Sequence, residues 1–153
     1  MLHFYTISFL FWTCSVFAQE SKQLTELNQL IDQWHVSAAK ADFKQYFDVT
    51  ANDFVFLGTA PGERWSKADF QSFCKPYFDK GKAWDFKPSN RMWNVVADGT
   101  VAYFDEDLQT WMESCRGCGI CIFIDGEWKI AYYNLTVLIE NEKIKKFIKL
   151  RKK

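Results

Sequence analysis

Three residues carry side chains that could move protons. His35 stands beside Trp34, one position off an apolar helical stripe, where an imidazole could act as general acid or base. Asp53 opens an apolar run whose phenylalanines would supply the partly apolar setting that strengthens a carboxylate base. Tyr46 could donate a hydrogen bond to a reacting group. The alternative interpretations are a structural histidine and a solvated aspartate that ends a loop.

Further hydrogen-bond donors lie in the second half of the chain. Tyr103, Tyr133 and Asn134 could join Tyr46 in holding a ligand carbonyl, as in an oxyanion hole. The sequence contains no Ser-His-Asp order, phosphate-binding loop or dinucleotide fingerprint. The candidate chemistry is therefore proton transfer, and no cofactor is expected.

Three arginines, Arg64, Arg91 and Arg116, each have apolar neighbours near or within a predicted strand. A buried arginine needs a carboxylate partner. The available partners are Glu63, Asp105, Glu106, Asp107 and Glu113. Structural ion pairs are the default interpretation, and an unpaired arginine that faced a cavity would bind a carboxylated ligand.

The cysteines at positions 115, 118 and 121 have a spacing that resembles a metal site. The segment that carries them reads as a strand, on which successive side chains alternate between faces. Cys115 and Cys121 then point one way and Cys118 the other, so we predict no metal site. With Cys74 these make four cysteines, among which one disulfide is possible in an oxidising compartment.

Composition and charge narrow the function classes. The chain has 153 residues, of which 48% are apolar and 18% aromatic, which is enough for one domain with a core. Residues 143–153 hold seven of the nineteen basic residues and no acidic one, leaving twelve basic against nineteen acidic residues elsewhere. An acidic body is a poor nucleic-acid binder, so we expect no nucleic-acid partner. Membrane contact is expected only through the basic tail.

The first eighteen residues resemble an export signal. Residues 5–17 are mostly apolar, and Val16-Phe17-Ala18 would suit cleavage before Gln19. No Lys or Arg precedes Lys22, so the usual positive start is missing. A buried N-terminal strand is the alternative. The sequence predicts a signal peptide over residues 1–18 and a periplasmic or secreted product.

Helical spacing predicts a first helix over residues 21–40, a short second helix over 43–47, and a third that starts after Ser66, buries Phe70, Phe73 and Tyr77, and ends at Gly81. Strands are predicted at 53–59, 84–97, 101–112, 116–124 and 128–140. Pro88 in the second of them requires a bulge or an edge position. Asp98-Gly99 and Asp125-Gly126 are hairpin signals, so the last four strands should form an antiparallel meander. The expected class is α+β, with helices packed on one face of the sheet.

Several ordered motifs within residues 23–141 carry a family resemblance. They are Gly58-Thr59, Glu63-Arg64-Trp65, residues 75–78, residues 128–130 and residues 133–135. With them the chain resembles SnoaL-like domains of the nuclear transport factor 2-like superfamily, closest to small bacterial members. It departs from their pattern at residues 60–62 and at Cys118, where polar residues are usual.

The resemblance implies a cone-shaped domain over residues 19–142. In it a strongly curved, mostly antiparallel sheet and three N-terminal helices close a pocket, and a basic tail follows. It also implies a small-molecule ligand, association as a homodimer, and either simple binding or an isomerase, dehydratase or cyclase reaction. The predicted catalytic residues are His35, Tyr46 and Asp53. The predicted ligand-binding residues are Trp34, Thr59, Arg64, Trp65, Arg91, Tyr103, Arg116, Tyr133 and Asn134.

Overall fold

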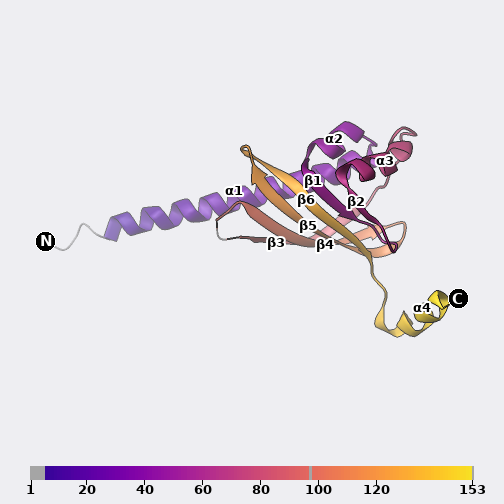
Figure 1. The fold of residues 1–153 in the computed structure, drawn as a ribbon. Helices are drawn as coiled ribbons and strands as arrows, with labels where there is room; N and C mark the ends of the chain where they lie inside the picture. Colours follow the sequence, from indigo (N-terminus) through magenta and orange to yellow (C-terminus); the bar gives the residue numbers. More distant parts are fainter. Residues whose placement is uncertain (1–5, 97, 153) are drawn as a thin grey trace.

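The structure is a six-stranded sheet with helices, which confirms the predicted α+β class. The computed structural model describes the backbone of residues 6–96 and 98–152 and the side chains of residues 22–96 and 98–152. In chain order the elements are α1 Thr6–Ala39, α2 Phe43–Asp48, β1 Thr50–Leu57, β2 Arg64–Ser66, α3 Lys67–Phe78, β3 Lys87–Val95, β4 Val101–Thr110, β5 Glu113–Ile124, β6 Glu127–Val137, η1 Asn141–Lys143 and α4 Ile144–Arg151 (Figure 1).

The strands form one sheet in the order β2-β1-β6-β5-β4-β3. The predicted meander is confirmed, because each strand from β3 to β6 pairs antiparallel with the next strand in the chain. At the β5–β6 turn Asp125 and Gly126 both have positive φ, as the tightest hairpin turns require. The sequence did not predict β2, nor that β1 would pair parallel to β6.

The outermost strand accommodates Pro88, which cannot donate a hydrogen bond to a neighbouring strand. Strand β3 lies at one edge of the sheet, and its pairing with β4 shifts register between Ser89 and Met92. Asn90 within this irregularity has a φ of 50°. Pro88 therefore occupies an edge strand beside a bulge, as the sequence predicted.

One face of the sheet packs against the helices. Leu27, Ile31 and Trp34 of α1 share a buried core with residues from α2, α3 and the inward face of the strands. The strand members of this core are Phe54, Phe56, Ala102, Phe104, Leu108, Cys115, Cys121, Trp128, Ile130, Tyr133 and Leu135. The alternation along β4, β5 and β6 thus directs every second side chain toward the helices.

Helix α1 is longer than the sequence predicted, since it starts at Thr6 and not near residue 21. Its first part extends beyond the sheet (Figure 1). The predicted signal peptide, residues 1–18, falls on residues whose side chains lie outside the described part, so export stays a prediction. In the residues that the structure describes, no helix combines the length and apolar character needed to cross a membrane.

Helix α3 begins at a side-chain cap. Ser66 Oγ accepts a hydrogen bond from the backbone N–H of Asp69 and donates one to its carboxylate, at 3.3 Å and 2.7 Å. The sequence predicted Phe70, Phe73 and Tyr77 as the buried face, and this was wrong for two of them. Phe73 and Tyr77 are 40% and 47% exposed, and α3 instead buries Phe70, Cys74 and Phe78 at a spacing of four.

The cap of α3 generates a prediction about stability. Replacing Ser66 by Ala leaves the Asp69 N–H without its side-chain partner, so the free energy of unfolding should fall by about 1 kcal/mol. Urea unfolding would measure this loss. The matched control is Ser72→Ala, an exposed serine inside the same helix whose hydroxyl only bonds the Ala68 carbonyl. Equal losses in the two variants would contradict a capping role.

Candidate functional site

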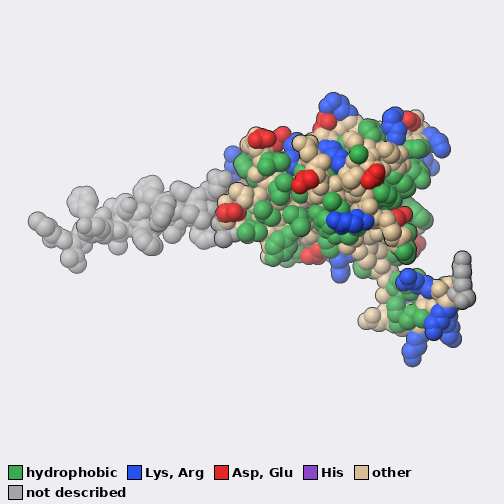
Figure 2. All heavy atoms as spheres, in the orientation of Figure 1, with side chains coloured by type: hydrophobic (Ala, Val, Ile, Leu, Met, Phe, Trp, Pro, Cys, Tyr) green, Lys and Arg blue, Asp and Glu red, His purple; other side chains and the backbone are tan. Residues whose placement is uncertain are grey.

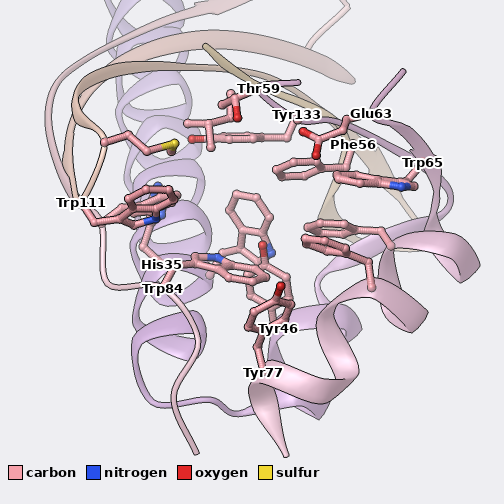
Figure 3. A pocket seen from close by; sticks show the side chains of 17 residues that line it. His35, Tyr46, Phe56, Thr59, Glu63, Trp65, Tyr77, Trp84, Trp111 and Tyr133 are labelled. Atoms are coloured by element: carbon pink, nitrogen blue, oxygen red, sulfur yellow. The ribbon is translucent and has the colours of Figure 1, made fainter. Parts of the chain in front are cut away.

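A pocket with a volume of about 360 Å³ lies between helices α1, α2 and α3 and the inner face of the sheet. Seventeen residues line it, and eleven of them are aromatic (Figure 3). The aromatic members are Trp34, Tyr46, Phe56, Trp65, Phe70, Phe73, Tyr77, Trp84, Phe86, Trp111 and Tyr133; the others are His35, Gly58, Thr59, Glu63, Met112 and Leu135. This volume and lining are typical of small-molecule sites.

The aromatic rings around the pocket pack in stacked and edge-to-face pairs. Phe56 and Phe70 stack with centroids 4.0 Å apart and planes 12° apart. Trp34 stacks on Tyr46 at 4.9 Å and meets Tyr133 edge-on at 4.7 Å. The parallel β1–β6 pairing sets Phe56 directly beside Tyr133. Sheet register and helix phase together build walls from ring faces.

Glu106 lies behind the pocket and is fully buried at the middle of β4. Its Oε1 is 2.7 Å from His35 Nε2 and accepts a hydrogen bond from the Tyr133 hydroxyl at 2.9 Å. Its Oε2 accepts from Arg91 Nε at 2.9 Å and lies 2.8 Å from Arg91 Nη2. A carboxylate surrounded by these groups is held as the anion, because each group favours the charged form.

The neighbours of Glu106 determine its ionisation. Burial by itself raises the pKa of this carboxyl, but the hydrogen bond and charge of His35, the charge of Arg91 and the Tyr133 hydroxyl outweigh it. The pKa of Glu106 therefore lies below its ordinary value of 4.5. Burial, reinforced by Glu106, holds the pKa of Tyr133 well above its usual range. Tyr133 thus stays protonated as a donor.

Arg91 connects Glu106 to helix α1. Its Nη1 lies 2.8 Å from the carboxylate of Asp32 and donates to the side chain of Asn28 at 3.1 Å. The indole of Trp93 donates to the same Asn28 oxygen at 3.0 Å. The network therefore joins α1, β3, β4 and β6 behind the pocket.

Gly117 makes room for the hydrogen bond between Tyr133 and Glu106. It lies on β5, paired with Glu106 on one side and with Leu135 on the other. A Cβ at this position would stand 2.0 Å from the Tyr133 hydroxyl and 3.1 Å from Glu106 Oε1. Only glycine lets Tyr133 lie across β5 to reach the carboxylate.

His35 presents its other ring nitrogen to the pocket. Because the Glu106 carboxylate can only accept, Nε2 of His35 carries the hydrogen that it donates. In neutral His35, Nδ1 is then an acceptor, and it has no hydrogen-bond partner among the described residues. His35 lines the pocket, and its ring centroid lies 5.5 Å from that of Trp34 and 6.4 Å from that of Tyr133 (Figure 3). The pocket therefore contains an imidazole that is oriented from behind by a carboxylate.

A second polar group of the lining also has no partner. The indole nitrogen of Trp34 is fully enclosed and makes no hydrogen bond within the described part of the chain. An unpaired buried N–H costs about 1–3 kcal/mol. Burial raises the pKa of the Tyr46 hydroxyl well above its usual range, so Tyr46 stays protonated.

Half of the residues that the sequence proposed for the site line the pocket, namely Trp34, His35, Tyr46, Thr59, Trp65 and Tyr133. They come from α1, α2, the segment after β1, β2 and β6. Their approach depends on the sheet and helices folding over one another, since almost a hundred residues separate the first from the last.

The other six proposed residues lie outside the lining. Asp53 and Arg64 are exposed near the β1–β2 end of the sheet. Tyr103, Arg116 and Asn134 point to the outer face, where Arg116 lies 3.6 Å from Asp107 and Asn134 bonds Thr136. Arg91 lies behind the pocket wall in its ion pair with Glu106. These six do not meet the base and donors around the cavity.

From the sequence, Glu106 was predicted only as a possible partner for an arginine and not as the centre of the site. A signal was present in the strand pattern. Ala102, Phe104 and Leu108 form the apolar face of β4, and Glu106 falls on the same face by alternation. A carboxylate on an apolar face must have buried partners.

The cysteine prediction agrees with the strand geometry. Cys115 and Cys121 are buried, Cys118 is half-buried on the opposite face, and all three are free together with Cys74. Within the described ranges, no three His, Cys, Asp or Glu residues are grouped so that they could hold a metal ion.

The buried network generates a prediction with pH dependence. Because the pKa of Glu106 is lowered on folding, its charge stabilises the fold above pH 4.5, and this contribution is lost as the pH falls through the folded pKa. Tyr133→Phe removes one hydrogen bond to the Glu106 carboxylate. The free energy of unfolding at neutral pH should therefore fall by about 1.5–3 kcal/mol. Acid destabilisation should also begin at a higher pH, since the pKa of Glu106 rises.

Urea unfolding across the acidic pH range measures both effects. Tyr132→Phe is the control, because Tyr132 is the preceding residue on β6 and is only half-buried on the other face. The same acid profile in both variants would show that the Tyr133 hydroxyl does not stabilise the Glu106 anion.

Comparison with known proteins identifies the family. The family model for the SnoaL-like domain matches residues 27–140. A search of curated protein sequences finds no match.

Solved structures share the fold at low identity. A nuclear transport factor 2-like protein from Pseudomonas putida has 13% identity and a TM-score of 0.64, over 78% of this chain and 89% of its own. A protein proposed to be a scytalone dehydratase, from Novosphingobium aromaticivorans, has 11% identity and a TM-score of 0.66, over 78% and 87%. A protein proposed to be an aromatic ring hydroxylase from the same species has 14% identity and a TM-score of 0.65, over 78% and 91%. The matched family model and the curved sheet with its helices agree: the chain belongs to the SnoaL-like domain family, within the nuclear transport factor 2-like fold.

Proposed function

We propose that the pocket binds a small, flat and largely apolar molecule. The observation that carries this proposal is the cavity of about 360 Å³ with its eleven aromatic side chains. Ring faces favour flat ligands.

The polar lining favours an uncharged ligand over a carboxylated one. The described lining contains the carboxylate of Glu63 and no Lys or Arg. Arg64, Arg91 and Arg116, which the sequence offered as carboxylate partners, lie outside it. A ligand with a hydroxyl group would match His35 Nδ1 as acceptor.

Trp111 at the pocket rim provides a direct test. Its side chain is 82% exposed although it lines the pocket, so its truncation should not weaken the fold. A bound ring would cover this indole. We expect Trp111→Ala to bind 2-naphthol on the order of tenfold more weakly than the unchanged protein, as measured by quenching of the remaining tryptophans.

Tyr103→Ala is the matched control, because Tyr103 is a half-exposed aromatic residue on the outer face of the sheet. Its affinity for 2-naphthol should be unchanged. Loss of binding in the Tyr103 variant alone, or no binding by the unchanged protein to any flat bicyclic probe, would contradict a ligand site in the pocket.

A second candidate function is catalysis by proton transfer without a cofactor. It is favoured by the 2.7 Å contact between His35 and Glu106, which orients the imidazole and leaves Nδ1 free to take a proton. Tyr46 lines the same cavity and could stabilise an enolate oxygen. An isomerase, dehydratase or cyclase step would use this combination of base and donor.

Proton transfer can be tested without knowledge of the natural substrate. The α-hydrogens of 2-tetralone, a flat bicyclic ketone, should exchange with solvent deuterium faster in the presence of the protein. We expect His35→Gln to slow this exchange by about 10²–10⁴-fold, because glutamine can bond Glu106 but cannot accept the proton. Proton NMR in heavy water follows the exchange.

Asp53→Asn is the control for the other carboxylate base that the sequence suggested. Asp53 is exposed and outside the pocket lining, so its removal should not change the rate. Equal exchange rates in the unchanged protein and in the His35→Gln variant would exclude His35 as the base while leaving ligand binding intact. Homodimer formation and export stay predictions.

A further inference from the structure

Helix α4 is set apart from the domain and has two chemically distinct sides. It follows β6 after a short segment and stands away from the sheet and the other helices (Figure 1). None of its residues is buried, and Leu150 is 76% exposed. Figure 2 shows apolar and basic side chains together on this small, separate body.

The two sides follow from the helical repeat of about 3.6 residues per turn. The apolar side carries Ile144, Phe147, Ile148 and Leu150, and the basic side carries Lys145, Lys146 and Lys149. Arg151 falls on the apolar side by the same repeat, and its guanidinium lies over the Phe147 ring at 5.6 Å. The helix therefore exposes apolar surface to water with no covering element among the described residues, beside a dense positive charge.

We propose that α4 binds the surface of membranes that contain anionic lipids. Lying in the plane of the membrane, the helix would bury its apolar side among the acyl chains and place its lysines beside the lipid phosphates. Residues 143–153 contain seven basic residues and no acidic one, whereas residues 1–142 carry seven more acidic than basic residues. Because α4 stands off the domain, it can reach the lipid without bringing the acidic body against it.

The exposed apolar side distinguishes a membrane from other anionic partners. A nucleic acid would neutralise the lysines but would not cover Ile144, Ile148 and Leu150. The other possible partner of α4 is a second copy of the chain, in which an acidic groove lies between α1 and the β5–β6 hairpin. Its carboxylates already have partners: Glu26 with Lys22 at 3.7 Å, Asp32 with Arg91 at 2.8 Å and Glu127 with Lys129 at 2.9 Å. The groove therefore offers little uncompensated charge.

Co-sedimentation with lipid vesicles tests the proposal. The full chain should sediment with vesicles of equal parts phosphatidylcholine and phosphatidylglycerol, bind much more weakly to phosphatidylcholine alone, and be released by high salt. Neutralising Lys145, Lys146 and Lys149 to Gln should lower the affinity roughly a hundredfold. Phe147→Asp should lower it by about tenfold or more, because it places a charge on the apolar side.

The control neutralises three exposed lysines of the body, Lys40, Lys80 and Lys82, to Gln. It changes the net charge by the same amount, and vesicle binding should persist. Since α4 buries nothing, its variants should keep the thermal unfolding temperature of the unchanged chain. Absence of vesicle binding, or equal losses in the tail and body variants, would overturn the proposal. So would self-association that requires α4 and is abolished by Glu127→Lys.

Discussion

The buried carboxylate of Glu106 is the interaction on which the arrangement of the pocket depends. An ionised group at the centre of β4 is tolerated only because His35, Arg91 and Tyr133 surround it. Each of these partners belongs to a different element, so the charge fixes α1, β3 and β6 relative to β4. The cost of leaving such a charge unpaired selects one packing of the helix on the sheet.

The same constraint orients the polar groups of the pocket. The carboxylate fixes the hydrogen on Nε2 of His35 and directs Nδ1 away from the core, as second-sphere carboxylates do in many sites. It also holds the Tyr133 ring against Trp34 and Phe56, where the ring forms part of the wall. This arrangement requires glycine at position 117, because a side chain there would occupy the position of the Tyr133 hydroxyl. Stability and site geometry therefore share the same residues.

The domain and helix α4 differ in their net charge and in the apolar surface that they expose. The domain is acidic and encloses its aromatic residues around a cavity, whereas α4 is basic and leaves its apolar side uncovered. The pocket lining includes no residue of α4 in the part of the chain that the structure describes. The proposed ligand binding in the pocket and the proposed lipid binding at the tail therefore depend on different residues.

By itself the sequence determined what depends on local spacing. Its turn signals and period-two alternation predicted the four-stranded meander, the edge position of Pro88 and the opposite faces of Cys115 and Cys118, because these follow from strand geometry. The capping serine of α3 was likewise readable, but the helix phase that exposes Phe73 and Tyr77 was not. Only the tertiary structure decided which polar residues meet. The parallel pairing of β1 with β6 and the packing of α1 across β4 bring His35 to Glu106, 71 positions away, and leave Asp53 outside. Contacts of this kind are set by how elements pack in space, and no local pattern encodes them.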